Sequence, residues 1–347
     1  MLLAPHQAPV TAMTIEPMEI IQPPWLSLNP IARIRGARMG MMIMTARVEA
    51  KTDRKIARRV MASTQFNNAS HSHIIVAFRG RASLGVAGDD AYQIGMSTTP
   101  APLADRIALV VGASRGIGYE SALALAKAGA HVIATARTQG GLEELDDAVF
   151  AATGRHATLI PFDLVDGGAI DRLGGAIFER FKKLDVWVHA AATMGPSGLT
   201  PVSHADPREF AKVEKTNFTA VYRLIRSLEP LLRASDAGRA IHFTTSVATN
   251  PRAFWGMYAA TKAGAEALVK AWADEIESTP VRACIVDPGR MRTAMRAQAY
   301  PGEDPSVLPH PSEIGPLVVD LARPDATPPL TTRFQDWKAG SSIEALI

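Results

Sequence analysis

The sequence predicts an α/β fold in which helices cover both faces of one parallel sheet. From Leu103 onward, short apolar runs alternate with longer segments rich in Ala and Leu. A glycine-rich turn joins the first apolar run to the first of these segments. Strands that alternate with helices form parallel sheets through right-handed crossovers. A single doubly wound domain is therefore expected.

The elements can be placed in order along the chain. Strands are expected at 107–111, 131–135, 158–162, 186–190, 240–245 and 282–286, and a short segment at 330–334 would make the sheet seven-stranded instead of six-stranded. Helices are expected at 119–128, 142–152, 168–181, 206–234 and 258–278. The fourth helix should break near Asn217, and the last should stop before Pro280, which cannot continue it.

The first strand leads into a turn with the pattern Gly112-x-x-x-Gly116-x-Gly118. Glycines permit tight turning and close backbone approach, and the following helix offers free N–H groups to a pyrophosphate. A simple loop would also contain glycines, but the strand before and the helix after favour a dinucleotide-binding unit.

Tyr258 and Lys262 are four residues apart, so a helix places them on one face. A phenol titrates near pH ~10, and a fixed cation beside it would lower that pKa toward neutrality. The pair therefore suggests acid–base chemistry, and Ser246 lies upstream of it. A surface aromatic–cation pair is the alternative when the motif stands alone.

Taken together, these motifs resemble the classical short-chain dehydrogenase/reductase (SDR) family, with a Rossmann-type domain over residues 103–347. The matching motifs, in family order, are Gly112-x-x-x-Gly116-x-Gly118, Asp163, His189-Ala190-Ala191-Ala192, Asn217, Ser246, Tyr258-x-x-x-Lys262 and Asp287-Pro288-Gly289 with Thr293. Residues 292–305 are similar to the YciK-like branch of bacterial SDR oxidoreductases. The His-Ala-Ala-Ala turn departs from the Asn-Ala-Gly type usual in the family.

The cofactor expected is NADP(H), and no metal is expected. An acid usually closes strand two in NAD enzymes, whereas this chain has Arg137 there and Arg115 in the glycine turn. Either arginine could instead be simply solvated. The resemblance implies further cofactor contacts at Ser114, Ile117, Asp163, Leu164, Ala190, Ala191, Pro288, Gly289 and Thr293. Capping of the next helix is the alternative role for Asp163.

The resemblance implies hydride transfer between nicotinamide and a carbonyl or alcohol substrate. Tyr258 would exchange the proton, and Lys262 would hold the nicotinamide ribose and lower the Tyr258 pKa. Ser246 would bind the substrate oxygen, and Asn217 would bend its helix and anchor a water. The substrate loops would be 193–200, 250–257 and 290–309, with Phe254, Trp255, Met194, Met291 and Met295 as candidate apolar lining.

Residues 1–95 differ from the rest of the chain. They contain 11 of the 37 Lys and Arg, against 6 of the 34 Asp and Glu. We expect a disordered extension, with Met96 as a plausible natural start. An organelle transit peptide and a basic tail for an anionic partner are the alternatives.

Composition limits the remaining possibilities. Cys284 is the single cysteine, which suits a reducing compartment, and a cytoplasmic protein is expected. No membrane partner is expected, because no apolar stretch approaches the ~18 to 20 residues of a spanning helix. Residues 96–347 are nearly neutral, so no nucleic-acid partner is expected.

The resemblance implies a homodimer or homotetramer. A noncatalytic NADP-binding sensor or scaffold, and an epimerase or dehydratase, are the rival functions.

Overall fold

A computed structural model describes residues 101–344. The predicted extension at residues 1–95 and the start at Met96 lie outside these residues. A seven-stranded sheet forms the centre of the described part, with the strand order β3-β2-β1-β4-β5-β6-β7. The strands are β1 (Ile107–Val111), β2 (His131–Ala136), β3 (Thr158–Pro161), β4 (Val186–His189), β5 (Arg239–Phe243), β6 (Arg282–Asp287) and β7 (Thr331–Arg333).

Every neighbouring pair of strands is parallel. The prediction of a doubly wound α/β sheet is therefore confirmed, and β7 settles the strand number at seven. The strand order reverses between β1 and β4, since β2 and β3 lie on one side of β1 and the later strands on the other. Ligands of such sheets bind at this switch point, beyond the carboxyl ends of the strands.

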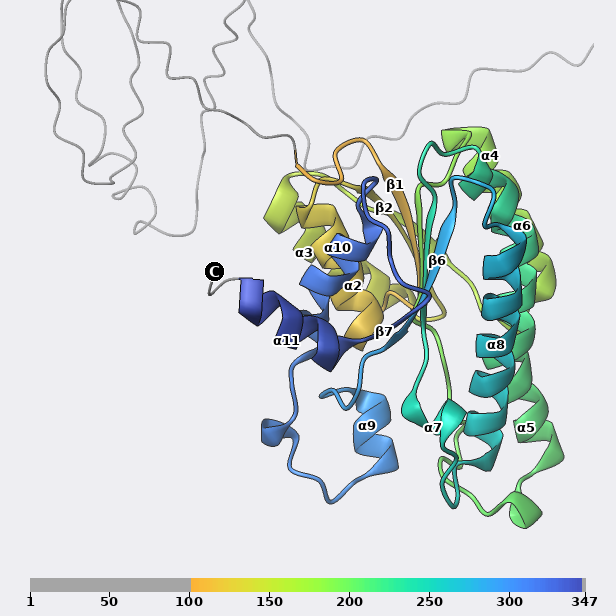
Figure 1. Cartoon of the computed structure of the whole chain (residues 1–347). Helices are drawn as coiled ribbons and strands as arrows, with labels where there is room; N and C mark the ends of the chain where they lie inside the picture. The colour runs from red at the N-terminus through yellow and green to blue at the C-terminus, as the bar shows by residue number, and fades with distance from the viewer. Residues whose placement is uncertain (1–100, 345–347) are drawn as a thin grey trace, which may run out of the picture. The chain divides into compact units, whose positions relative to one another are not determined.

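Helices pack on both faces of the sheet (Figure 1). One face carries α2 (Gly116–Lys127), α3 (Gln139–Thr153) and α10 (Gly315–Ala322), and the other carries α4 (Gly167–Phe181), α6 (Ala220–Arg233) and α8 (Gly256–Glu275). The remaining helices are α5 (Pro207–Glu214), α7 (Ser246–Thr249), α9 (Ala294–Ala299) and α11 (Phe334–Glu344), with 3-10 turns at Val202–His204, Pro305–Val307 and Pro311–Ile314.

The sheet therefore has two apolar cores, one on each face. Leu125, Val188 and Leu317 belong to the core beneath α2 and α10, and Trp187, Leu224 and Val269 belong to the core beneath α6 and α8. Alternate residues of each strand contribute to opposite cores, because successive strand side chains point to opposite faces. This burial fixes the register of the strands and hence the positions of their ends.

The predicted break near Asn217 is confirmed as a π-helical turn, Lys215–Thr219, between α5 and α6. The structure also corrects three predicted helix ends by three residues each, and one of them is the start of α3, at Gln139 instead of residue 142. Helix α2 begins at Gly116, three residues before the predicted start, because the glycine turn already belongs to its first turn. Helix α8 ends at Glu275, three residues before the predicted end at residue 278.

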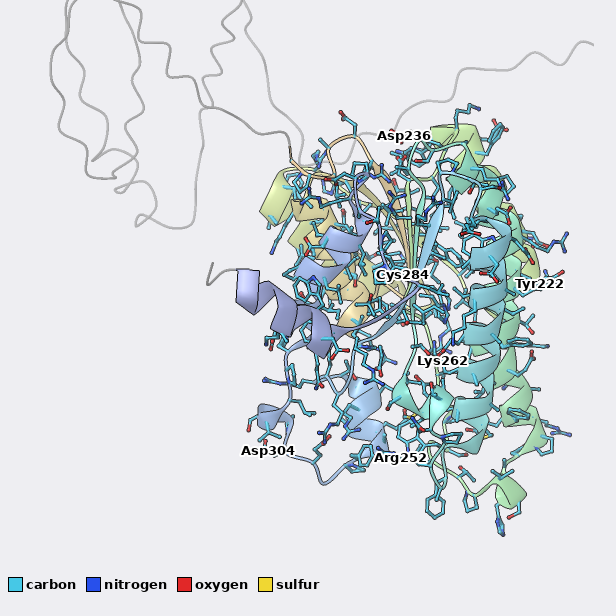
Figure 2. All side chains as sticks on the ribbon, viewed as in Figure 1. Tyr222, Asp236, Arg252, Lys262, Cys284 and Asp304 are labelled. Atoms are coloured by element: carbon cyan, nitrogen blue, oxygen red, sulfur yellow. The ribbon has the colours of Figure 1, made fainter. Side chains whose placement is uncertain are left out.

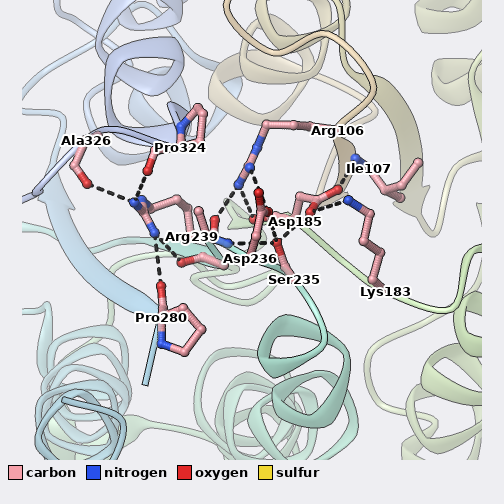
Figure 3. Close-up of polar contacts among 12 residues, drawn as sticks. Arg106, Ile107, Lys183, Asp185, Ser235, Asp236, Arg239, Pro280, Pro324 and Ala326 are labelled. Carbon is pink, nitrogen blue, oxygen red and sulfur yellow. Dashed lines mark hydrogen bonds and ion pairs between the residues drawn. The ribbon is translucent and has the colours of Figure 1, made fainter. Parts of the chain in front are cut away.

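A polar network holds the amino ends of the central strands, at the edge opposite the switch point (Figure 3). Asp185 precedes β4 and accepts hydrogen bonds from Ile107 N (2.8 Å), Lys183 Nζ (3.0 Å) and Ser235 Oγ. Arg106 donates to the Asp185 carbonyl at 3.1 Å. Arg239 on β5 donates to the carbonyls of Pro324 and Ala326, at 2.6 and 2.9 Å. These bonds fix the amino ends of the strands, while loops at the carboxyl ends form the site.

Candidate active site

A cleft of about 1150 Å³ lies at the carboxyl ends of the strands. Every residue predicted to contact the cofactor lines it: Gly112, Ser114, Arg115, Gly116, Ile117, Gly118, Arg137, Asp163, Leu164, Ala190, Ala191, Tyr258, Lys262, Pro288, Gly289 and Thr293. Ser246 lines the cleft as well. Segments that are up to 181 positions apart along the chain are thus gathered around one cavity.

The glycine turn leaves room where side chains would otherwise stand. Gly112 has a φ of +91°, and a Cβ placed there would lie 2.7 Å from the Ala191 nitrogen. A Cβ on Gly118 would lie 2.1 Å from the Gly112 carbonyl oxygen. Larger residues cannot be accommodated at either position. The backbone therefore stays open at the amino end of α2, where the first N–H groups have no partner within the helix.

These features fit a dinucleotide. A pyrophosphate would bind the free N–H groups at the start of α2, where the helix dipole also favours negative charge. Thr293 faces this end of α2, because its Cγ2 lies 3.4 Å from the position of a Cβ on Gly116. Arg115 and Arg137 are exposed and line the cleft. No acid closes β2, which ends at Ala136 before Arg137.

Asp163 does not cap the next helix. The cap of α4 is Asp166, whose carboxylate accepts a hydrogen bond from Ala169 N at 3.1 Å. Asp163 instead accepts one from Val165 N, also at 3.1 Å, and lines the cleft beside Leu164. The alternative role for Asp163 is therefore wrong, because the turn between β3 and α4 is long enough for a later aspartate to reach the helix start.

Tyr258 and Lys262 lie on the buried face of α8, and both side chains line the cleft. Burial, with a smaller contribution from the Asp287 carboxylate, raises the pKa of Tyr258 well above its ordinary value. The Lys262 ammonium donates a short hydrogen bond to the Phe243 carbonyl of β5. The expected lowering of the Tyr258 pKa by Lys262 is thus not found, because desolvation of the phenolate and the Asp287 charge both act in the opposite direction.

Burial also acts on the lysine, and it lowers the pKa of Lys262 to about 8. The Glu266 carboxylate opposes this effect from one helical turn along α8. Glu266 is held by Thr244 Oγ1 at 2.8 Å and by Lys270 Nζ at 2.7 Å. Lys262 is thus a buried cation whose proton is held much less tightly than that of a surface lysine.

Asn217 lies behind the cleft instead of lining it, and only 1% of its surface is exposed. Its side-chain oxygen accepts from Thr193 N at 2.8 Å, and its nitrogen donates to Thr193 O at 2.8 Å and to Thr261 Oγ1 at 3.1 Å. The neighbouring Thr216 lines the cleft. Asn217 therefore connects the π-helical turn to the loop after β4 and to α8.

The cleft end next to Tyr258 is partly apolar. Val247, Trp255, Met291, Met295 and Tyr300 line it, whereas Met194 and Phe254 do not. Met194 is buried beneath Tyr258, and Phe254 is 55% exposed. Phe254 has a φ of +72°, and its carbonyl accepts a hydrogen bond from Thr200 N at 3.1 Å. Two of the predicted lining residues are therefore wrong, because the loop geometry turns Phe254 outward and packing covers Met194.

Sequence reasoning missed two side chains of the site. His242 on β5 lies 3.5 Å from the Lys262 ammonium, measured from its Nε2. A polar residue inside the apolar run Ala240–Phe243 is the signal that could have identified it. Arg252 lines the cleft near Trp255, and no hydrogen-bond partner of its side chain occurs within residues 101–340. Figure 2 shows Arg252 between α7 and α9.

Comparisons with known proteins agree with this geometry. The model of the short chain dehydrogenase family (adh_short) matches residues 106–304. The chain therefore belongs to the short-chain dehydrogenase family.

Three similar proteins refine this membership. The uncharacterized oxidoreductase YciK of Escherichia coli K12 is 37% identical over 226 residues, which are 65% of this chain and 88% of that protein. A short chain dehydrogenase of Shigella flexneri 2a, solved in complex with NADP, has a TM-score of 0.65 at 35% identity over 68% of this chain and 99% of its own. One from E. coli CFT073, complexed with NADPH, has a TM-score of 0.65 at 36% identity with the same coverage. The resemblance to the YciK-like branch is confirmed.

No helix within residues 101–344 combines the length and the apolar character needed to cross a bilayer. No cluster of three or more His, Cys, Asp or Glu side chains arranged to bind a metal ion occurs in that same part of the chain. Cys284 is a residue of β6 buried in the core, and burial raises the pKa of its thiol to about 11. A thiol held this firmly in its protonated form is a packing group.

Proposed function

We propose that this SDR oxidoreductase uses NADP(H) to interconvert a carbonyl compound and the corresponding alcohol. The observation that carries the proposal is the convergence of Ser246, Tyr258 and Lys262 on the cleft that also contains the open glycine turn. When bound, the nicotinamide cofactor would supply or accept the hydride. The protein must orient both reactants and move one proton.

Tyr258 is the proposed proton donor during reduction. Its raised pKa keeps the phenol protonated at neutral pH, so a proton is available for the oxygen that gains negative charge. Ser246 is exposed at the start of α7, where its hydroxyl can donate a hydrogen bond to that oxygen.

Lys262 is proposed to hold the nicotinamide ribose hydroxyls. An ammonium has three donors, and the Phe243 carbonyl takes one of them. Lys262 also lines the cleft, so a remaining donor can reach a hydroxyl there. Asn217 is proposed as a positioning residue, since it holds the Thr193 backbone beside the cleft.

NADP is the proposed form of the cofactor. Arg115 and Arg137 are cationic where the adenosine ribose would lie, and a guanidinium suits a phosphate. Solved relatives with NADP and NADPH support this proposal. The absence of an acid at the end of β2 removes the usual acceptor for the NAD 2′-hydroxyl.

A noncatalytic NADP-binding sensor or scaffold is the second candidate function. It is less well supported, because a sensor has no need for Tyr258 and Lys262 at the cleft. A cytoplasmic location is proposed with the first function, since a single cysteine suits a reducing compartment.

The test is a screen of NADPH oxidation by the full chain against aldehydes, ketones and quinones. The panel should include carbonyl compounds that bear a carboxylate, because Arg252 places a positive charge beside the apolar end of the cleft. Turnover of at least one compound that depends on Tyr258 is the expected result. NADPH binding without turnover of any carbonyl or alcohol would favour the sensor.

A further inference from the structure

Two buried histidines form a polar layer inside the sheet, next to the proposed site. His189 ends β4 and His242 lies beside it on β5, and the strand register pairs the two residues directly. Their rings stack with centroids 5.2 Å apart and planes 4° apart. The exposed fractions are 1% for His189 and 3% for His242. Both residues point to the face that α8 covers, because Ala240 and Trp187, two positions earlier on each strand, pack there.

The pair lacks the hydrogen bonds that buried polar groups normally make. Within the described residues, both ring nitrogens of His189 and Nδ1 of His242 have no partner. The gap between His242, Trp187 and Trp272 has no space for a water molecule. Each such unpaired group costs stability. The remaining nitrogen, His242 Nε2, lies 3.5 Å from Lys262 Nζ.

Both rings are neutral at pH 7. Burial lowers the pKa of His189 to about 3, and burial with the Lys262 charge lowers the pKa of His242 well below its ordinary value. A neutral imidazole has one donor and one acceptor nitrogen. Since the ammonium can only donate, Nε2 of His242 is the acceptor and Nδ1 carries the proton.

We propose that His242 is a positioning residue for Lys262. Its Nε2 and the carbonyl of the adjacent Phe243 are two acceptors from β5 that engage two of the three ammonium donors. The third donor is then directed to the cleft, where the proposed function needs it for the ribose hydroxyls. This inference rests on the proposed function, and it explains why a neutral polar ring stands in an apolar strand.

The contact with His242 should affect the ionisation of Lys262. The groups that face the ammonium are His242 and the Phe243 carbonyl from β5, the more distant His189 from β4, and Glu266 from its own helix. An acceptor within reach stabilises the charged form, so its removal should lower the Lys262 pKa further. NADPH affinity should then decline at a lower pH than in the parent protein.

The test compares His242→Leu, His242→Gln and His242→Asn in the full chain. The Gln amide reaches the place of Nε2, whereas the shorter Asn amide reaches only the place of Nδ1. NADPH binding is followed by cofactor fluorescence between pH 6 and 10. The Leu and Asn variants should bind NADPH about tenfold more weakly, with the alkaline decline about one pH unit lower, and Gln should restore both. His131→Leu removes a histidine of β2 that bonds Thr158 away from the cleft, and it serves as the matched control.

The outcomes separate this inference from the proposed function. If the Leu variant does not fold, the comparison of Gln with Asn still decides the matter, since both carry an amide. Equal affinity and equal pH dependence for these two variants would overturn the positioning role. Failure of the parent protein to bind NADPH would instead overturn the proposed function, because these measurements require no substrate.

Discussion

Asn217 binds the backbone of Thr193 through both atoms of its amide, with each hydrogen bond 2.8 Å long. Thr193 lies in the loop that follows β4 and lines the cleft, and Asn217 lies in the π-helical turn between α5 and α6. A π-helical turn frees backbone groups and often marks a functional site. The contact therefore fixes one wall of the cleft to the helix layer.

Asn217→Ala should destabilise the protein and weaken catalysis together. The substitution leaves a half-buried N–H and C=O of Thr193 without partners, at a cost of roughly 2–6 kcal/mol if each group loses about 1–3. Urea unfolding followed by circular dichroism measures the loss. Asn250→Ala, at an exposed position, should change the midpoint little. An Asn217→Ala protein as stable as the parent would show that the double contact does not form in solution.

Tyr258→Phe should leave NADPH binding nearly intact while turnover on an identified substrate falls by about 10² to 10⁴-fold. Only the phenolic hydroxyl group is removed, and the ring remains to pack beside Trp255. Tyr222→Phe removes the same group from a ring 47% exposed on α6, labelled at the right of Figure 2, and should be neutral. Near-normal turnover by Tyr258→Phe would end the assignment of this residue as the acid.

Much of this site could be predicted from the sequence because its motifs are local. A strand, a glycine turn and a helix define the cofactor end within about twenty residues, and Tyr258 and Lys262 share one helix face by spacing alone. The direction of the Lys262 ammonium was not predictable in this way. It depends on acceptors from β5, which only the sheet register brings beneath α8. The raised pKa of Tyr258 is likewise a consequence of three-dimensional burial.

The positions of loop side chains were likewise not predictable from spacing alone. Spacing predicted which segments reach the cleft, but the left-handed backbone of Phe254 turns that ring to solvent, and Met194 is covered by packing. Short elements such as α7 and α9 carry too little periodicity for a sequence pattern to reveal them. Their caps, Thr245 and Thr293, become recognisable only once the adjoining strands are placed.

Arg137→Asp should remove the preference for NADPH over NADH. An acid at this position can accept from a ribose 2′-hydroxyl and repels a 2′-phosphate. The parent should bind NADPH at least about tenfold more tightly, a difference of ~1.4 kcal/mol, as measured by calorimetry. Arg180→Asp makes the same change of charge at an exposed site on α4 and should preserve the preference. Equal affinities of the parent for the two cofactors would contradict the NADP assignment.

Lys262→Met should stabilise the free protein at pH 7 while weakening NADPH binding. The folded pKa of Lys262, about 8, is below its ordinary value of 10.5, so folding disfavours the charged form. Below pH 8 the buried charge lowers the free energy of unfolding of the parent by its full amount. That amount is about 3 kcal/mol, at ~1.4 kcal/mol for each unit of the pKa shift. Between pH 8 and 10.5 the unfolded chain holds more protons, so the parent gains stability as the pH rises.

The difference in Tm between Lys262→Met and the parent should therefore be largest near pH 7 and shrink toward pH 10. Lys270→Met alters an exposed lysine of the same helix and should show no such trend, apart from the loss of its pair with Glu266. A Lys262→Met protein that melts below the parent at pH 7 would mean that the hydrogen bond to Phe243 outweighs the cost of burial.

Self-association through α8 is the last prediction. Ala267 and Ala271 are exposed on the surface of this helix, and small residues there allow a second helix to approach closely. Gly264 has a packing role inside the protomer instead, because a Cβ there would lie 3.1 Å from the Phe218 ring. A homodimer or homotetramer is expected from light scattering at micromolar concentration. Ala271→Glu should dissociate it by burying an unpaired charge, whereas Ala151→Glu, at an exposed position on α3, should not. A parent protein that scatters only as a monomer would exclude the interface.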